Sequence, residues 1–73
     1  MKKYAVIDML PGDWFETIFD TKKEALEYAE SSWSGLTAYD QKRREEYYVC
    51  RCSLDEDGCV DFDTIDEIVK QHK

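Results

Sequence analysis

The chain has 73 residues and a mass of 8.7 kDa, which is the size of one small domain, residues 1–73. Hydrophobic residues make up 42% and aromatic residues 14%, so disordered and low-complexity classes of protein are excluded. The net charge of −7 repels phosphate, which argues against direct binding to nucleic acid or to anionic membranes. Since no stretch approaches the roughly 18 apolar residues of a membrane span, we expect a cytoplasmic protein.

The first twenty residues predict a β-hairpin. Residues 4–9 and 14–19 are rich in β-branched and aromatic side chains, which favour strands. Pro11 and Gly12 lie between them and suit a tight turn, because Pro fixes φ near −65° and Gly accepts a positive φ. We therefore expect the two strands to pair in antiparallel fashion.

Two helices are predicted in the middle of the chain. Thr21 and Glu24 form a capping box, in which the Thr hydroxyl and the Glu carboxylate bond reciprocally to backbone amides. Gly35 favours the end of this first helix. Thr37 with Asp40 predicts the start of a second, shorter helix. The apolar stripe of the long helix is Ala25, Leu26, Ala29, Trp33 and Leu36.

The last third of the chain predicts a second hairpin followed by a final helix. Residues 47–54 read as a strong strand, the sequence 55–58 as a hairpin turn, and residues 59–62 as a short returning strand. From Asp63 or Thr64 onward we expect a helix whose inward residues are Ile65, Ile68 and Val69. The fold class is therefore α+β, with a small antiparallel sheet in the order β-β-α-(α)-β-β-α. This sheet is expected to pack against one long helix and one or two short helices.

The first strand is apolar on both faces, which has a consequence for the architecture. A sheet with one face in water alternates apolar and polar residues, but Tyr4 and Val6 lie on one face, and Ala5 and Ile7 on the other. Both faces of the sheet therefore need cover. The long helix covers one face, and either the final helix or a second copy of the chain covers the other. We favour the monomer over the homodimer.

The cysteines and the histidine do not form a recognisable reactive or metal site. Cys50, Cys52 and Cys59 are an odd number, and with His72 their spacing matches no zinc site. We expect them to be reduced core residues. His72 is next to the last residue, too near the end to be held as a catalytic base. We expect no enzyme activity, no cofactor and no metal.

The acidic residues are the most distinctive feature of the surface. Residues 55–67 hold seven acids and no Lys or Arg. The basic run 42–44 is interpreted as a solvated helix face offset by Glu45 and Glu46. We expect a non-catalytic accessory protein that acts by protein–protein interaction, with a basic protein as its partner. The alternative is a DNA mimic that inhibits a nucleic-acid-binding protein. The candidate partner surface comprises Trp14, Asp55, Glu56, Asp57, Asp61, Asp63, Asp66 and Glu67.

A resemblance to a group of small acidic proteins bears on the alternative. The order and spacing of Tyr4–Met9, Phe19–Leu26, Trp33, Leu36–Thr37 and Lys42–Val49 resemble proteins encoded in gut Firmicutes (Clostridia-like) genomes, often on mobile elements. The resemblance covers about residues 4–49 and departs near Cys50–Cys59. It implies a bacterial cytoplasmic protein and raises the DNA-mimic function, but it transfers no activity and no site residue.

Overall fold

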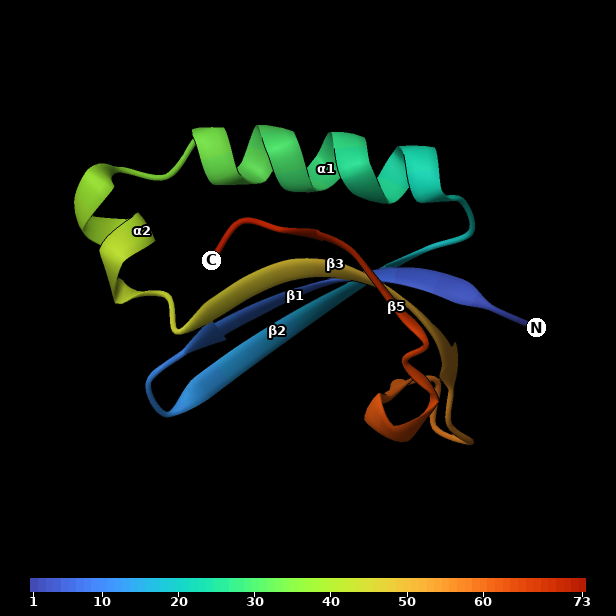
Figure 1. Ribbon diagram of the computed structural model, residues 1–73. Helices are drawn as coiled ribbons and strands as arrows, with labels where there is room; N and C mark the ends of the chain where they lie inside the picture. Colours follow the sequence, from blue (N-terminus) through green and yellow to red (C-terminus); the bar gives the residue numbers. More distant parts are fainter.

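The computed structural model describes all 73 residues and has the α+β fold predicted from the sequence (Figure 1). The elements are β1 (Lys3–Leu10), β2 (Asp13–Phe19), α1 (Lys22–Ser34), α2 (Ala38–Arg43), β3 (Glu46–Leu54), β4 (Val60–Asp61), the 3-10 turn η1 (Phe62–Thr64) and β5 (Glu67–Gln71). In the antiparallel sheet, β2 pairs with β1 and β1 with β3, while β5 and β4 pair one after the other with the outer edge of β3. Helix α1 lies across one face of this sheet.

The predicted turn and the two N-caps of the first half are confirmed, but the reciprocal half of the capping box is not. The Glu24 carboxylate accepts a hydrogen bond from the Thr21 hydroxyl at 2.9 Å and not from the Thr21 backbone amide. Gly12 has a φ of +79°, the left-handed conformation for which glycine is suited. The Thr21 side-chain oxygen accepts a hydrogen bond from the Glu24 N–H at 3.2 Å, and Thr37 accepts one from the Asp40 N–H at 3.1 Å. Each bond satisfies a backbone donor that the first turn of a helix otherwise leaves unpaired.

The central strands β1 and β3 bury side chains on both faces, and this produces two separate hydrophobic cores. Burying one Val or Ile side chain stabilises a fold by about 1.5–3 kcal/mol, so neither face can stay in water without a large loss. The core under α1 consists of Val6, Ala25, Ala29, Tyr47 and Val49. The core on the opposite face consists of Ala5, Ile7, Tyr48, Cys50, Cys52 and Val60.

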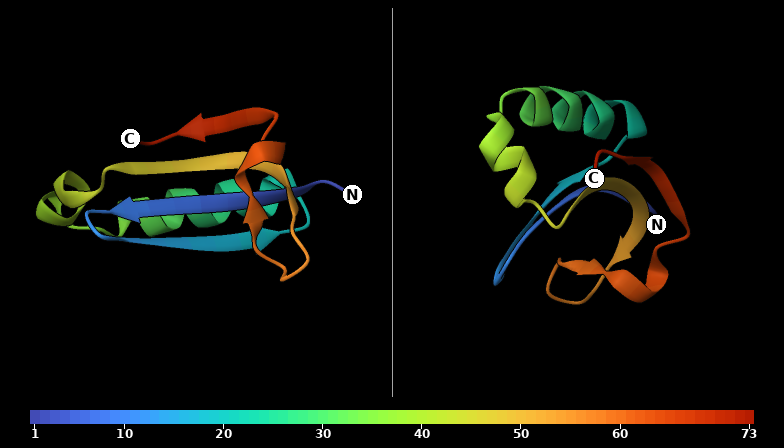
Figure 2. Two further views of the ribbon diagram at one scale, coloured as in Figure 1. Left: turned by 90° about the horizontal axis from the view of Figure 1, so that it is seen from below. Right: turned by 60° about the vertical axis from the view of Figure 1, so that its left-hand side comes forward.

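The sheet covers its second face by curling over it. The side away from α1 is concave, and β4 with η1 crosses this concave side at one end (Figure 2). The Glu16 carboxylate of β2 accepts a hydrogen bond from the backbone N–H of Val60 in β4 at 3.0 Å. This bond links the first edge of the sheet to the segment beneath it. The other end of the concave side has no such cover.

The prediction of a final helix from Asp63 or Thr64 is wrong. The Asp61 side chain caps only the single turn η1, and the chain then runs as β5. The Thr64 hydroxyl accepts a hydrogen bond from the Ser53 N–H at 2.8 Å, which fixes η1 against β3. Pairing with β5 satisfies the outer backbone groups of β3, which a helix could not do. This non-local pairing overrides the local helical spacing of Ile65, Ile68 and Val69.

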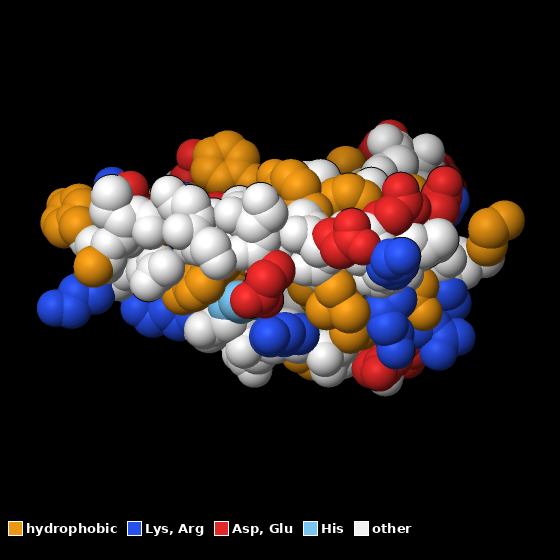
Figure 3. Space-filling view, turned by 90° about the horizontal axis from the view of Figure 1, so that it is seen from above, with side chains coloured by type: hydrophobic (Ala, Val, Ile, Leu, Met, Phe, Trp, Pro, Cys, Tyr) orange, Lys and Arg blue, Asp and Glu red, His pale blue; other side chains and the backbone are white.

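A contact between α1 and the C-terminal segment holds β5 in place. The carboxylate of Glu30 lies 3.4 Å from the ammonium of Lys70 and 3.2 Å from the imidazole Nε2 of His72. The His72 ring packs against the rings of Trp33 and Tyr47, and its side chain is only 6% exposed. On this side of the molecule, acidic and basic side chains lie interspersed, and the histidine is visible among them (Figure 3). The C-terminal segment is therefore part of the core under α1.

We predict that Glu30 stabilises the protein in a pH-dependent way. Hydrogen bonds with His72 and Lys70 hold the pKa of the Glu30 carboxyl below its ordinary value of 4.5. Its stabilising contribution is therefore complete above that value and is lost as the pH falls through the lower pKa of the folded state. Urea unfolding at about pH 5.5 and about pH 3 should show that Glu30→Gln destabilises the protein less at the lower pH.

The matched control is Glu27→Gln on the same helix, where an exposed pair with Lys23 at 4.0 Å should contribute little. A difference between wild type and Glu30→Gln that is the same at both pH values would contradict the prediction.

The cysteine prediction is confirmed at two positions and is wrong at the third. Cys50 and Cys52 are buried, whereas Cys59 is exposed because it lies in the turn between β3 and β4. In that turn the Asp55 carboxylate accepts a hydrogen bond from the Cys59 backbone N–H at 3.0 Å. All three thiols are free.

We predict that only Cys59 reacts with a thiol reagent in the folded protein. Burial raises the pKa of the Cys50 thiol to about 12 and also raises the pKa of Cys52. Because the thiolate is the nucleophile and a buried thiol is out of reach of the reagent, both should be inert at about pH 8. Desolvation and the neighbouring Asp55 carboxylate raise the pKa of Cys59 as well, so its reaction depends on its exposure. Mass spectrometry should find one label on the native protein, none on native Cys59→Ser, and a label on every cysteine in urea. Labelling of native Cys50 or Cys52 at the rate of Cys59 would contradict the buried assignment.

Candidate functional site

The uncovered end of the concave side forms a groove of about 570 Å³. Its apolar surface comes from Met9, Leu10, Trp14 and Phe62, which belong to β1, β2 and η1. Its polar surface comes from Asp13, Glu45 and Glu46. No Lys or Arg side chain lines the groove. The site is therefore an apolar surface framed only by carboxylates.

Trp14 of β2 and Phe62 of η1 line the groove from two different segments of the chain and contact each other. Their rings meet edge to face with centroids 5.4 Å apart, an arrangement that aromatic pairs favour. They remain 46% and 39% exposed, which is unusual for such large apolar side chains. Trp14 lies opposite Met9 in the β1–β2 register, so its side chain shares the concave face with Met9.

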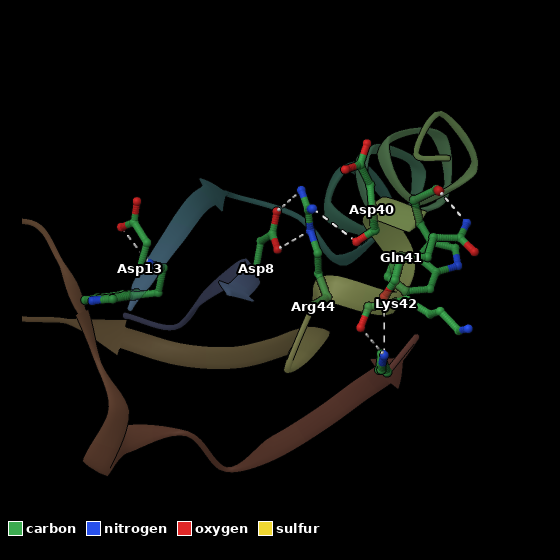
Figure 4. Close-up of polar contacts among 9 residues, drawn as sticks. Asp8, Asp13, Asp40, Gln41, Lys42 and Arg44 are labelled. Atoms are coloured by element: carbon green, nitrogen blue, oxygen red, sulfur yellow. Dashed lines mark hydrogen bonds and ion pairs between the residues drawn. The ribbon is translucent and has the colours of Figure 1, made fainter. Parts of the chain in front are cut away.

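The acidic wall of the groove is positioned by the junction between α2 and β3. The Glu45 N–H donates a hydrogen bond to the Met9 carbonyl at 2.7 Å, which extends the β1–β3 ladder to the edge of the groove. Next to it, Arg44 Nε and Nη2 donate to the two oxygens of Asp8 at 3.0 and 3.4 Å (Figure 4). Arg44 also donates to the Asp40 carbonyl of α2 at 3.1 Å. This forked pair fixes the chain where Glu45 begins.

Three acids of the predicted partner surface have structural partners. The Asp55 carboxylate accepts from the backbone N–H groups of Asp57 and Cys59 at 2.9 and 3.0 Å, within the turn. Asp61 caps η1 by accepting from the Asp63 N–H at 3.1 Å. Asp66 forms ion pairs with Lys2 and Arg51 at 3.5 and 3.9 Å. The remaining acids, Glu56, Asp57, Asp63 and Glu67, are exposed and have no ion-pair partner.

The sequence-predicted residues and the groove overlap at one point. Trp14 lines the groove, and its neighbour Phe62 belongs to the acidic stretch 55–67. None of the seven acids of that stretch lines the groove. Glu45 and Glu46 were instead interpreted as partners of the basic run 42–44. No local signal identified them, because Glu46 reaches the groove only through its pairing with Met9 and Glu45 only through its hydrogen bond to the Met9 carbonyl.

The buried thiols and the imidazole lie on opposite faces of the sheet. Cys50 and Cys52 belong to the core on the concave side, whereas His72 packs with Trp33 and Tyr47 under α1. The sheet therefore separates the buried thiols from the imidazole. No group of three or more His, Cys, Asp or Glu side chains converges in a geometry that could hold a metal ion. No helix combines the length and apolar character needed to cross a membrane.

Comparison of the chain with protein-family models, with curated proteins and with solved structures gave no match.

We predict that the Asp8–Arg44 pair stabilises both the fold and the acidic wall. Both side chains are mostly buried, so removing one leaves a charge without its partner. Arg44→Ala should lower the free energy of unfolding by about 1–2 kcal/mol, between the values for exposed and fully buried pairs.

Urea unfolding of Arg44→Ala, Asp8→Asn and the double variant would give the coupling energy of the pair. Purely additive effects of the two substitutions would contradict the prediction.

Proposed function

We propose that this chain is a non-catalytic interaction module that binds a basic protein partner at the groove. The observation that carries the proposal is the combination of an exposed Trp14–Phe62 pair with a frame made only of carboxylates. Exposed aromatic side chains are the residues that most often supply binding energy at protein interfaces. The carboxylates select for Lys or Arg beside the apolar residue that enters the groove.

The charge of the molecule supports a basic partner over a second copy of the chain. Each copy carries a net charge of −7, so self-association brings like charges together. A basic partner is attracted by the same field, which raises the association rate and aligns the two surfaces.

The shape of the groove supports a macromolecule over a small ligand. Small-molecule sites bury roughly 70–90% of their ligand in a cleft or cavity. Here Trp14 and Phe62 are themselves about half exposed, so the groove is a surface depression. A protein surface can cover such a depression and its acidic frame together.

We predict that binding depends on Trp14, Glu45 and Glu46. The protein immobilised at its N-terminus would be exposed to a lysate of the source organism, and bound proteins would be quantified by mass spectrometry. Basic proteins captured by wild type should then be purified and titrated directly. Trp14→Ala should weaken their affinity by about thirtyfold, the effect of losing a binding hot spot of about 2 kcal/mol.

The double variant Glu45→Gln/Glu46→Gln should weaken the same binding and reduce its salt dependence. The matched control is Asp57→Asn/Asp63→Asn, which removes an equal charge outside the groove. Equal binding by wild type and the two groove variants would contradict the proposal.

The second candidate function is a DNA mimic, in which carboxylates replace phosphates. It is favoured by the four acids Glu56, Asp57, Asp63 and Glu67, which are exposed and have no ion-pair partner. The same experiment distinguishes it from the first. A mimic would lose its partner in Asp57→Asn/Asp63→Asn and retain it in Trp14→Ala, and the captured proteins would bind nucleic acid.

A further inference from the structure

We infer that the partner enters as an extended basic segment that adds a strand to the outer edge of β2. This inference rests on the proposed function, because it specifies how the basic partner binds next to the groove. Strand addition supplies affinity through main-chain hydrogen bonds, while alternate side chains of the added strand read the surface below. Three features of the molecule support it: a free edge, the absence of a bulge, Lys or Pro on that edge, and its charge.

The register shows which backbone groups of β2 face outward. The Met9 carbonyl accepts a hydrogen bond from Glu45, so the backbone groups of Met9 point toward β3 and away from β2. Trp14 lies opposite Met9, and the direction of backbone groups alternates along a strand. The N–H and C=O groups of Trp14, Glu16 and Ile18 therefore point away from β1, toward the free edge.

The outward-facing N–H groups of β2 differ in whether they already donate a hydrogen bond. The Trp14 N–H donates to the Asp13 carboxylate at 2.8 Å. The N–H groups of Glu16 and Ile18 have no hydrogen bond outside the sheet. The Glu16 residue does form a hydrogen bond with Val60, but through its side-chain carboxylate and not through its backbone N–H. Two donors on the same edge, two residues apart, are therefore available to a further strand.

The two edges of the sheet differ in protection. Proteins block exposed edges with Lys, Pro or β-bulges, because an open edge recruits other strands. The edge strand β5 has a register shift and carries Lys70. The edge strand β2 has an uninterrupted register with β1 and contains no Lys, Arg or Pro. The β2 edge therefore lacks a bulge, Lys and Pro, and its charged side chains, Asp13 and Glu16, are acidic, which attract a basic strand while opposing an acidic one.

The side chains of β2 indicate the chemistry of the added strand. Trp14, Glu16 and Ile18 share the concave face with the groove. On the added strand, an apolar or Arg side chain would suit the position opposite the Trp14 ring. A basic side chain would suit the position opposite the Glu16 carboxylate. If the β2 strands of two copies of the chain paired antiparallel about Glu16, the middle residue of β2, the two Glu16 carboxylates would lie opposite each other. Like charges in that position destabilise the pairing. An alternating basic and apolar segment is the occupant that fits.

The test uses a synthetic peptide that alternates Arg and Val over seven residues, the length of β2. Its binding to the 15N-labelled protein would be followed by NMR, together with amide hydrogen exchange of Glu16 and Ile18. At about 90% occupancy, exchange of both amides should slow about tenfold, since only free protein exchanges. The control peptide has the same sequence but is N-methylated at two adjacent central residues, which blocks pairing along either of its edges. It should bind more weakly and give no protection.

A matched pair of protein variants tests the edge without changing the groove. Phe15 of β2 is 55% exposed on the face opposite the groove, and Tyr39 of α2 is 70% exposed and distant in the fold. Phe15→Lys places a positive charge beside the added strand and should weaken binding about two- to fivefold. Tyr39→Lys makes the same change of charge elsewhere and should leave the affinity near wild type.

The outcomes separate the two proposals. Peptide binding that depends on Trp14 but leaves Glu16 and Ile18 unprotected would overturn strand addition and leave the proposed function standing. Absence of peptide binding would also overturn strand addition, while the captured-protein titrations judge the proposed function. Protection of the two amides that rises with protein concentration, without peptide, would identify a second copy as the occupant and overturn the inference.

Discussion

The central strands β1 and β3 are apolar on both faces, and the rest of the fold follows from the need to cover them twice. Helix α1 covers one face and uses 13 residues to do so. The chain builds no second helical layer, and the sheet instead curls so that β4 and η1 close one end of the second face. The Glu16–Val60 hydrogen bond fixes this closure. The cover is incomplete at the other end, and the groove lies there.

The sequence predicted those parts of the fold that depend on local chemistry. The hairpin turn at Gly12 and the caps Thr21 and Thr37 require particular residues at particular positions, and these residues were present. The requirement that both faces of the sheet be covered also followed from alternation along β1. The last segment was missed because the local spacing of Ile65, Ile68 and Val69 matches a helix, whereas the structure pairs this segment with β3. The deciding factor, the unpaired outer edge of β3, is a long-range property that no local window contains.

The candidate site was predicted only in part, for a related reason. Trp14 was recognised because a large aromatic residue directly after a turn is poorly placed for burial. Most acids were selected because acidic residues are dense in that part of the chain. Density does not show which carboxylates are already bonded to a backbone N–H or a Lys, and Asp55 and Asp61 are both bonded to backbone N–H groups. Glu45 and Glu46 approach Trp14 only through strand pairing, so their role depends on the tertiary structure.

The order of the strands also bears on the rate at which the protein folds. The β1–β2 hairpin is local in sequence. The other partner of β1 is β3, which follows α1 and α2 in the chain, so this pairing closes a long loop. Closing that long loop costs entropy before any contact between β1 and β3 compensates for it. Domains with such mixed topology fold more slowly than helical bundles of the same length. Formation of the β1–β3 pair is thus the step at which this small chain is expected to cross its main kinetic barrier.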